Sequence, residues 1–172
     1  MKIKNSWIEK MSGLRAVAEY EDMDDFSSLP YKKCTQVICF AFYENKLLLV
    51  YDGDKKSWGP AGGGIEKPET FEDCARRELQ EEANVKMLSF KPIGYQKAVL
   101  SQGPKEYQLR VFCEVEPLGK FIEDPDGDIT EIKYINPTDY IKYFDWGKVG
   151  ERIIERVLEF RNDTKHSLKD LV

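Results

Sequence analysis

The sequence predicts one domain of mixed α and β structure, either an α+β fold or a mixed α/β sandwich. Apolar runs of strand length, rich in β-branched and aromatic residues, recur between residues 34 and 135. Only residues 70–83 and 147–161 show the spacing of an amphipathic helix, so strands outnumber helices, and the helices stand alone or late in the chain. A length of 172 residues suits one core better than two.

The first thirty residues have the weakest pattern of the chain. Residues 14–20 (LRAVAEY) fit either a strand or a helical turn, and residues 21–30 form an acidic connection that ends in proline. This N-terminal extension, residues 1–30, has room for an extra strand or for a homodimer contact, and the sequence leaves both open.

The segments that follow predict a hairpin and a loop. Residues 34–43 (CTQVICFAFY) and 46–52 (KLLLVYD) are strand-like, with Glu44 and Asn45 at the turn between them. A polar loop at residues 52–57 leads on to three consecutive glycines, Gly62, Gly63 and Gly64.

The helix expected at residues 70–83 has a clear start. Thr70 is a favourable N-cap, and Asp73 three residues later makes a variant of the capping box. Pro68 lies just outside the helix, where a proline does no harm.

The second half of the chain predicts three more strands. They are expected at about residues 86–100, 106–116 and 131–135, with a turn at 101–105 and a loop at 123–128.

The chain is expected to end in two helices. Pro137 opens a short one, and residues 147–161 form a longer one whose apolar positions are Val149, Ile153, Ile154, Val157 and Phe160. The last eleven residues, 162–172, are polar and are expected to fray.

Charge and composition exclude some classes of function. The net charge is −5 and the pI is near 5.1, so a general nucleic-acid binder, which needs a basic face, is not expected. The four cysteines show no paired spacing and the single histidine lies in the tail, so no zinc site of ordinary spacing is predicted. No secretory signal and no apolar run of about 18 residues is present, which predicts a cytoplasmic protein without a membrane contact.

The C-terminal half of the helix at residues 70–83 carries an unusual cluster of acids. A helix C-terminus already holds about half a negative charge, yet Glu78, Glu81 and Glu82 all lie there. On a helical wheel they fall within or beside the apolar arc of Phe71, Cys74, Ala75 and Leu79. Because carboxylates that face the protein interior are costly without a partner, a bound divalent cation is favoured over a solvated surface helix paired to arginines. Ligands that are all oxygen suit Mg²⁺ or Mn²⁺.

The glycine run strengthens this interpretation. Without a Cβ, Gly62, Gly63 and Gly64 can bring main-chain carbonyl and N–H groups close to a metal ion or a phosphate. A glycine run alone is weak support, and it gains weight from its fixed distance before the acids.

Residues 63–85 resemble the Nudix box, G-x5-E-x7-R-E-U-x-E-E-x-G-U, in which U is aliphatic. Eight of the nine defined positions agree, namely Gly63, Glu69, Arg77, Glu78, Leu79, Glu81, Glu82 and Val85. Asn84 stands where the family has glycine. A left-handed residue is wanted at that position and asparagine is the usual second choice, so the geometry is expected to persist. The resemblance implies a Nudix-type α/β/α sandwich with a mixed sheet.

The resemblance also implies a reaction and roles for the residues of the box. The reaction is hydrolysis of a nucleoside diphosphate linked to another group, by water that attacks phosphorus with Mg²⁺ or Mn²⁺ present. By position, Glu78 and Glu82 are implied as metal ligands and Glu81 as a ligand or a base. Arg77 would orient the cluster through an ion pair with Glu69, and a backbone carbonyl near Gly62 or Gly63 would complete the metal shell.

In many family members the general base lies outside the box, in a loop before a later strand. The candidates here are Glu123, Asp124, Asp126, Asp128 and Glu131. Glu131 is preferred because it comes just before the strand-like residues KYI, and the alternative is a solvated acidic turn.

The substrate expected is a small nucleotide, either a nucleoside triphosphate or a nucleotide sugar. Aromatic residues that would stack on a base, or else belong to the core, are Phe42, Tyr51, Trp58, Tyr95 and Tyr107. A second class of function is a Nudix-fold module that senses a nucleotide without cleaving it, although the complete acid cluster speaks against it. A third is an acidic structural protein, whose melting temperature would not rise with added metal ions.

Overall fold

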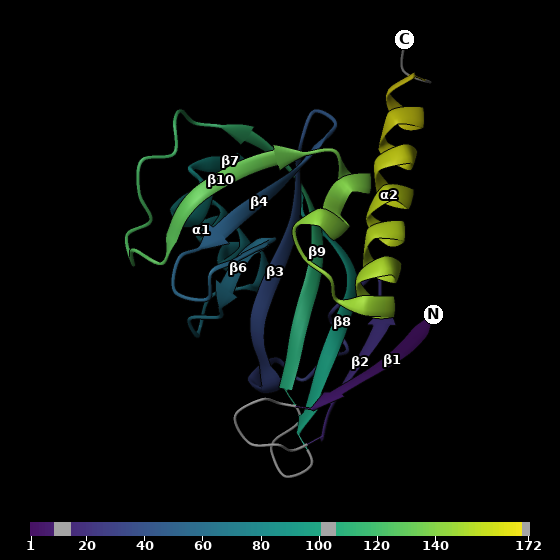
Figure 1. The fold of residues 1–172 in the computed structure, drawn as a ribbon. Helices are drawn as coiled ribbons and strands as arrows, with labels where there is room; N and C mark the ends of the chain where they lie inside the picture. The colour runs from purple at the N-terminus through teal and green to yellow at the C-terminus, as the bar shows by residue number, and fades with distance from the viewer. Residues whose placement is uncertain (9–14, 101–105, 170–172) are drawn as a thin grey trace.

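A computed structural model describes residues 1–8, 15–100 and 106–169, and Figure 1 shows the fold. The chain forms strands, two α-helices and two short 3₁₀ helices at Tyr31–Lys33 and Pro137–Lys142. In chain order the strands and α-helices are β1 (Lys2–Ile8), β2 (Arg15–Asp22), β3 (Cys34–Tyr43), β4 (Lys46–Asp52), β5 (Ser57–Gly59), β6 (Ala61–Gly64), α1 (Phe71–Ala83), β7 (Val85–Met87), β8 (Lys91–Leu100), β9 (Glu106–Pro117), β10 (Ile129–Ile135) and α2 (Gly147–Lys169).

The strands form a mixed sheet in the order β1-β2-β8-β9-β3-β4-β10. The pair β3 and β9 is parallel, and the other pairs along this path are antiparallel. Three short strands join at the side: β5 pairs with β4, β6 with β3, and β7 with β9. The predicted mixed sheet is therefore confirmed.

Helices cover both faces of this sheet, as Figure 1 shows. On β3, Val37, Cys39 and Ala41 belong to the core under α1, whereas Phe40 and Phe42 belong to the core under α2. The alternation follows from the two-residue period of a strand. A strand buried on both faces is apolar throughout, which is why CTQVICFAFY has so few polar residues. The predicted α/β/α sandwich is confirmed.

Several elements differ from the sequence prediction in their extent. The predicted hairpin of residues 34–43 and 46–52 has its turn, but β3 and β4 pair only at Phe42–Leu47 and Tyr43–Lys46. The strands separate because β6 occupies the edge of β3 from Gln36 to Cys39. Helix α2 continues to Lys169, past the predicted end at residue 161, because residues 162–169 contain no proline or glycine to stop it.

The N-terminal extension contributes to the sheet. Of the two structures considered for residues 14–20, the strand is correct, since β2 pairs with β8 along its whole length and β1 pairs with β2. The predicted turn at 101–105 lies outside the described residues. None of the described helices is long and apolar enough to cross a lipid bilayer.

Candidate active site

Helix α1 is held at both ends by the residues that the sequence suggested. The Thr70 hydroxyl accepts from the Asp73 N–H at 3.1 Å, and the Asp73 carboxylate accepts from the Thr70 N–H, which completes the capping box. At the other end Asn84 adopts the left-handed conformation, with φ 51° and ψ 49°. The expectation that asparagine replaces glycine there without loss of geometry is confirmed.

The glycine run of β6 lies directly against the acidic side of α1. A Cβ on Gly63 would come within 2.6 Å of the Glu78 carboxylate, and a Cβ on Gly62 would collide with the Val37 carbonyl. Gly62 also has φ +142° and donates its N–H to Glu82 Oε2 at 2.8 Å. Gly62 therefore needs glycine, whereas a side chain at Gly63 would displace the Glu78 carboxylate from its place beside the turn.

Arg77 is the hub of the charged network on α1. Its Nε and Nη2 donate to the two Glu69 oxygens at 3.2 and 2.8 Å, which is the bidentate pair predicted from the box. Nη1 reaches Glu78 at 2.7 Å and Glu81 at 3.3 Å, and Nη2 also reaches the Gly64 carbonyl at 2.9 Å. Arg77 lowers the pKa of the Glu69 carboxyl, and the bond to Glu69 in turn raises the pKa of Arg77. One guanidinium thus fixes three carboxylates and the glycine turn.

Two of the three clustered glutamates face the interior as the wheel predicted. Glu78 is 8% exposed, and burial raises its pKa although Arg77 opposes the shift. Burial also raises the pKa of Glu82 to about 8, against the effect of the Gly62 N–H. The prediction was wrong for Glu81, whose side chain is 38% exposed, because its position at the edge of the apolar arc lets it turn outward toward Arg77.

The donor set fits a hard divalent ion that keeps some of its water. Among the described residues no three acidic, cysteine or histidine side chains converge into a complete metal cage. Glu78 and Glu82 nevertheless flank the Gly62–Gly63 backbone from one helix, and Glu82 forms no ion pair within the described part of the chain. Mg²⁺ is commonly held by one or two carboxylates, with water and phosphate oxygens as the other ligands. Buried Glu78 and half-buried Glu82 beside a glycine turn meet that requirement.

The acidic loop after β9 approaches the same cluster from the other side. Asp124 is buried, accepts from the Ile129 N–H at 3.1 Å, and its charge contributes to the raised pKa of Glu82. Glu131 is exposed on β10, opposite Tyr51 of β4. The preference for Glu131 as general base stays a prediction, and nothing in the sequence singled out Asp124 among the five candidates.

Comparison with known proteins decides the family. Residues 32–157, well over half of the chain, match the NUDIX domain. The chain belongs to the Nudix hydrolase family. The predicted family is thereby confirmed.

Individual relatives of this Nudix hydrolase are distant. An uncharacterized Nudix hydrolase of Nostoc sp. is 30% identical over 103 residues, which span 57% of this chain and 57% of that relative. The structure resembles the pyrophosphohydrolase BsRppH of Bacillus subtilis, with a TM-score of 0.67 and 17% identity over 90% of this chain and 96% of the other. It also resembles a MutT Nudix hydrolase of Burkholderia pseudomallei, with a TM-score of 0.54 and 12% identity over 71% and 95% of the two chains. At these identities the two structures support the fold.

A groove of about 820 Å³ runs along the outer side of the Nudix helix α1. Arg77 and Glu81 line it together with Ile122 and Glu123 of the loop after β9. Ile122 is 85% exposed, so the groove is open to solvent.

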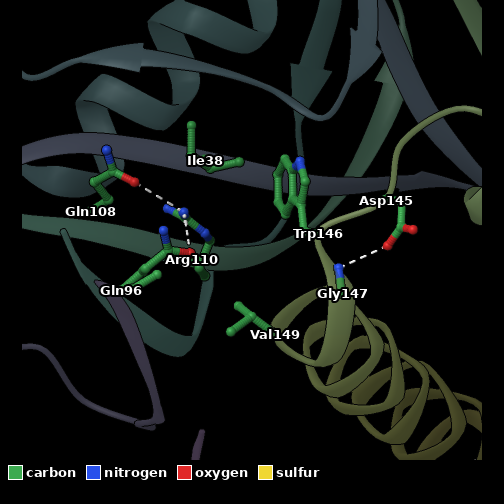
Figure 2. Close-up of a pocket in the computed structure, with 9 residues that line it drawn as sticks. Ile38, Gln96, Gln108, Arg110, Asp145, Trp146, Gly147 and Val149 are labelled. Atoms are coloured by element: carbon green, nitrogen blue, oxygen red, sulfur yellow. Dashed lines mark hydrogen bonds between the residues drawn. The ribbon is translucent and has the colours of Figure 1, made fainter. Parts of the chain in front are cut away.

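A second cavity, of about 540 Å³, lies on the opposite face of the sheet, between the strands and the start of α2 (Figure 2). The described residues that line it are Ala18, Ile38, Gln96, Gln108, Arg110, Asp145, Trp146, Gly147 and Val149. None of the five aromatic candidates from the sequence is among them, and the aromatic side chain in the wall is Trp146. No sequence pattern pointed to Trp146, because it lies before a helix and outside any periodic run of apolar residues.

The cavity and the glutamate cluster are separated by a single pair of strands. Ile38 of β3 lines the cavity, and its register partner in β6 is Gly62, whose N–H binds Glu82. The two sites of the Nudix domain thus share one wall.

Proposed function

We propose that this Nudix hydrolase cleaves the diphosphate linkage of a small nucleotide, either a nucleoside triphosphate or a nucleotide sugar, with Mg²⁺ or Mn²⁺ bound at Glu78 and Glu82. The observation that carries the proposal is the pair of carboxylates, buried Glu78 and half-buried Glu82, held against the Gly62–Gly63 backbone. Burial of two like charges on one helix is unfavourable unless a cation compensates them.

Each residue of the box has a part in this reaction. A divalent ion, when bound, polarises phosphoryl oxygens and lowers the pKa of bound water. Glu78 and Glu82 hold it, with a backbone carbonyl of Gly62 or Gly63 as a further donor. Arg77 keeps Glu78 in place, and Glu69 keeps Arg77 in place. Glu81 is the part of the cluster that reaches the open groove, where it can accept a proton from attacking water.

The cavity on the α2 face suits the organic group attached to the diphosphate. Its volume of about 540 Å³ is in the range of small-molecule sites, and Ile38, Val149 and Trp146 supply an apolar and aromatic wall. Ile38 and Gly62 are register partners, so the cavity and the glycine turn adjoin the same pair of strands.

A panel of nucleoside triphosphates and nucleotide sugars, incubated with Mg²⁺, tests the proposal through release of phosphate or pyrophosphate. The wild type should hydrolyse at least one substrate, and Glu82→Gln should lose that activity. The matched control is Glu72→Gln on the exposed side of the same helix, where Glu72 pairs only with Arg76, and it should retain activity.

Two outcomes would overturn the proposal. Turnover by Glu82→Gln equal to that of the wild type would show that the cluster does not hold a metal ion needed for hydrolysis. No turnover of any substrate, together with a nucleotide that raises the melting temperature, would favour the sensing module instead.

A further inference from the structure

Arg110 is a buried cation that has no carboxylate partner among the described residues. It lies in the middle of β9 and is 3% exposed. Among the described residues its acceptors are the Leu109 carbonyl at 3.3 Å and the side-chain oxygens of Gln96 and Gln108, each at 3.1 Å. Nε is buried with no hydrogen-bond partner. Burial lowers the pKa of Arg110 to about 10, so the environment opposes the charge that the residue carries.

A structural arginine of this fold is bonded differently. Arg152 on α2 is also buried, and its guanidinium binds Asp22 at 2.7 Å and Glu159 at 2.9 Å. Arginine is almost never fully buried unless it is paired in this way. Arg110 therefore lacks what a purely structural role would require.

The unpaired donors of Arg110 belong to a side chain that lines the 540 Å³ cavity. Figure 2 shows the guanidinium between Gln108 and Gln96, with Trp146 on the other side. The Cζ atom lies 5.8 Å from the centre of the Trp146 ring. Two glutamine oxygens fix Nη2 and the Leu109 carbonyl takes one N–H of Nη1, while Nε is buried away from the surface. The second N–H of Nη1 is therefore the donor left for a ligand, and it belongs to a guanidinium beside an aromatic plane.

This chemistry discriminates between nucleobases. Guanine presents the O6 carbonyl to a single N–H donor, and uracil presents ring carbonyls. Adenine places an amino donor where guanine has O6, and that donor would face a cation that has no acceptor to give. A site built with unpaired donors rejects a ligand that lacks the matching acceptor, because burial leaves those donors unsatisfied.

We propose that Arg110 is a specificity-determining residue that selects nucleotides whose base has a ring carbonyl, such as guanine, over adenine nucleotides. The proposal rests on the hydrolase function proposed above. Gln96 and Gln108 are positioning residues that orient the guanidinium toward the base.

Steady-state kinetics with GTP and ATP in the presence of Mg²⁺ test the selection. The wild type should show a higher kcat/KM for GTP, and Arg110→Met should reduce the GTP-to-ATP ratio about tenfold or more. The control Arg161→Met removes another arginine whose Nε is unpaired but which lies on α2 beside Phe42 and Asn45, and it should leave the ratio unchanged.

Calorimetric binding in a Glu82→Gln background separates this proposal from the hydrolase function, since it requires no turnover. GMP should bind at least tenfold more tightly than AMP, and Arg110→Met should abolish the difference. Equal binding of GMP and AMP to the Glu82→Gln protein itself would overturn the selection, whether or not the arginine variant folds. An equal loss of affinity for GMP and AMP in Arg110→Met would also overturn the proposal, because such a loss would show a general contact and not a base-specific one. Base-selective binding without hydrolysis of any nucleotide would leave Arg110's role standing and refute the hydrolase function alone.

Discussion

Two arginines on opposite faces of the sheet differ in their hydrogen-bond partners. Arg77, on the α1 face, binds three carboxylates and a backbone carbonyl, and every acceptor lies within 3.3 Å. Arg110, on the α2 face, is more deeply buried, yet it has only neutral acceptors and one buried nitrogen without any. A guanidinium whose N–H donors all have acceptors holds other groups in place. One with an unpaired N–H can still bind a ligand. The same residue type therefore positions the site on one face and is free to read a ligand on the other.

The largest effect is expected from replacing Glu82, the carboxylate of the cluster that Arg77 does not bind. Glu82→Gln should lower kcat by on the order of 10³, because loss of metal binding costs several kcal/mol of transition-state stabilisation. The melting temperature without added metal should stay equal or rise, since a neutral amide replaces a carboxylate whose burial raises its pKa to about 8. Mg²⁺ should raise the melting temperature of the wild type and have little effect on the variant. A fall of less than tenfold in kcat would show that Glu82 is not a ligand.

The next prediction compares two buried arginines on the α2 face. Arg152→Met should destabilise the protein by about 2 kcal/mol, because half-buried Asp22 would lose its guanidinium partner and keep only the N-terminal ammonium at 3.1 Å. Arg110→Met should change the free energy of unfolding by less than about 1 kcal/mol, or should increase it, because no carboxylate is orphaned. Urea denaturation measures both. A loss at Arg110 as large as that at Arg152 would give Arg110 a structural role.

A smaller effect is expected when Arg77 is replaced by lysine, which keeps the positive charge but lacks the planar guanidinium. Arg77→Lys should reduce kcat/KM by about 10- to 100-fold, because a lysine cannot bind Glu69 bidentately while it also holds Glu78. Stability should fall by about 1–2 kcal/mol. Arg76→Lys is the matched control, since Arg76 is exposed and bonded only to Glu72. Equal activity in the two lysine variants would contradict the positioning role.

The smallest effect is expected at the end of the Nudix helix. Asn84→Gly restores the residue that the box prescribes and relieves the left-handed conformation, but it removes the bond from Asn84 Nδ2 to the Lys120 carbonyl at 3.1 Å. These terms nearly offset each other, so the free energy of unfolding should change by less than about 0.5 kcal/mol in urea denaturation. A change above 1 kcal/mol would show that one of them dominates.

The contrast between the faces also separates what the sequence could predict from what it could not. The capping box at Thr70, the left-handed Asn84 and the pair of Arg77 with Glu69 depend on spacings within a single loop and helix. Local spacing determines local geometry, so these features were predictable. Arg110 gave no signal, because its burial results from β8, β9 and α2 meeting in space, and an arginine in a strand usually faces solvent.

Two features were misjudged for different reasons. Glu81 lies at the margin of the apolar arc, and its side chain turns toward Arg77, four residues away on the same helix. The separation of β3 from β4 depends on a four-residue glycine-rich strand that no propensity scale favours. Long-range pairing overruled the local pattern at the second place, and a contact within the helix decided the first.

The pairing of Ile38 with Gly62 joins the cavity to the carboxylates through one pair of strands. Backbone hydrogen bonds between β3 and β6 fix the position of the glycines against their acids. A slip of one residue in that pairing would carry the glycines past the acids, whereas Ile38 would keep its place because β3 also pairs with β9. Bond cleavage is therefore expected to be lost, and recognition of the base to be kept, when this edge is altered.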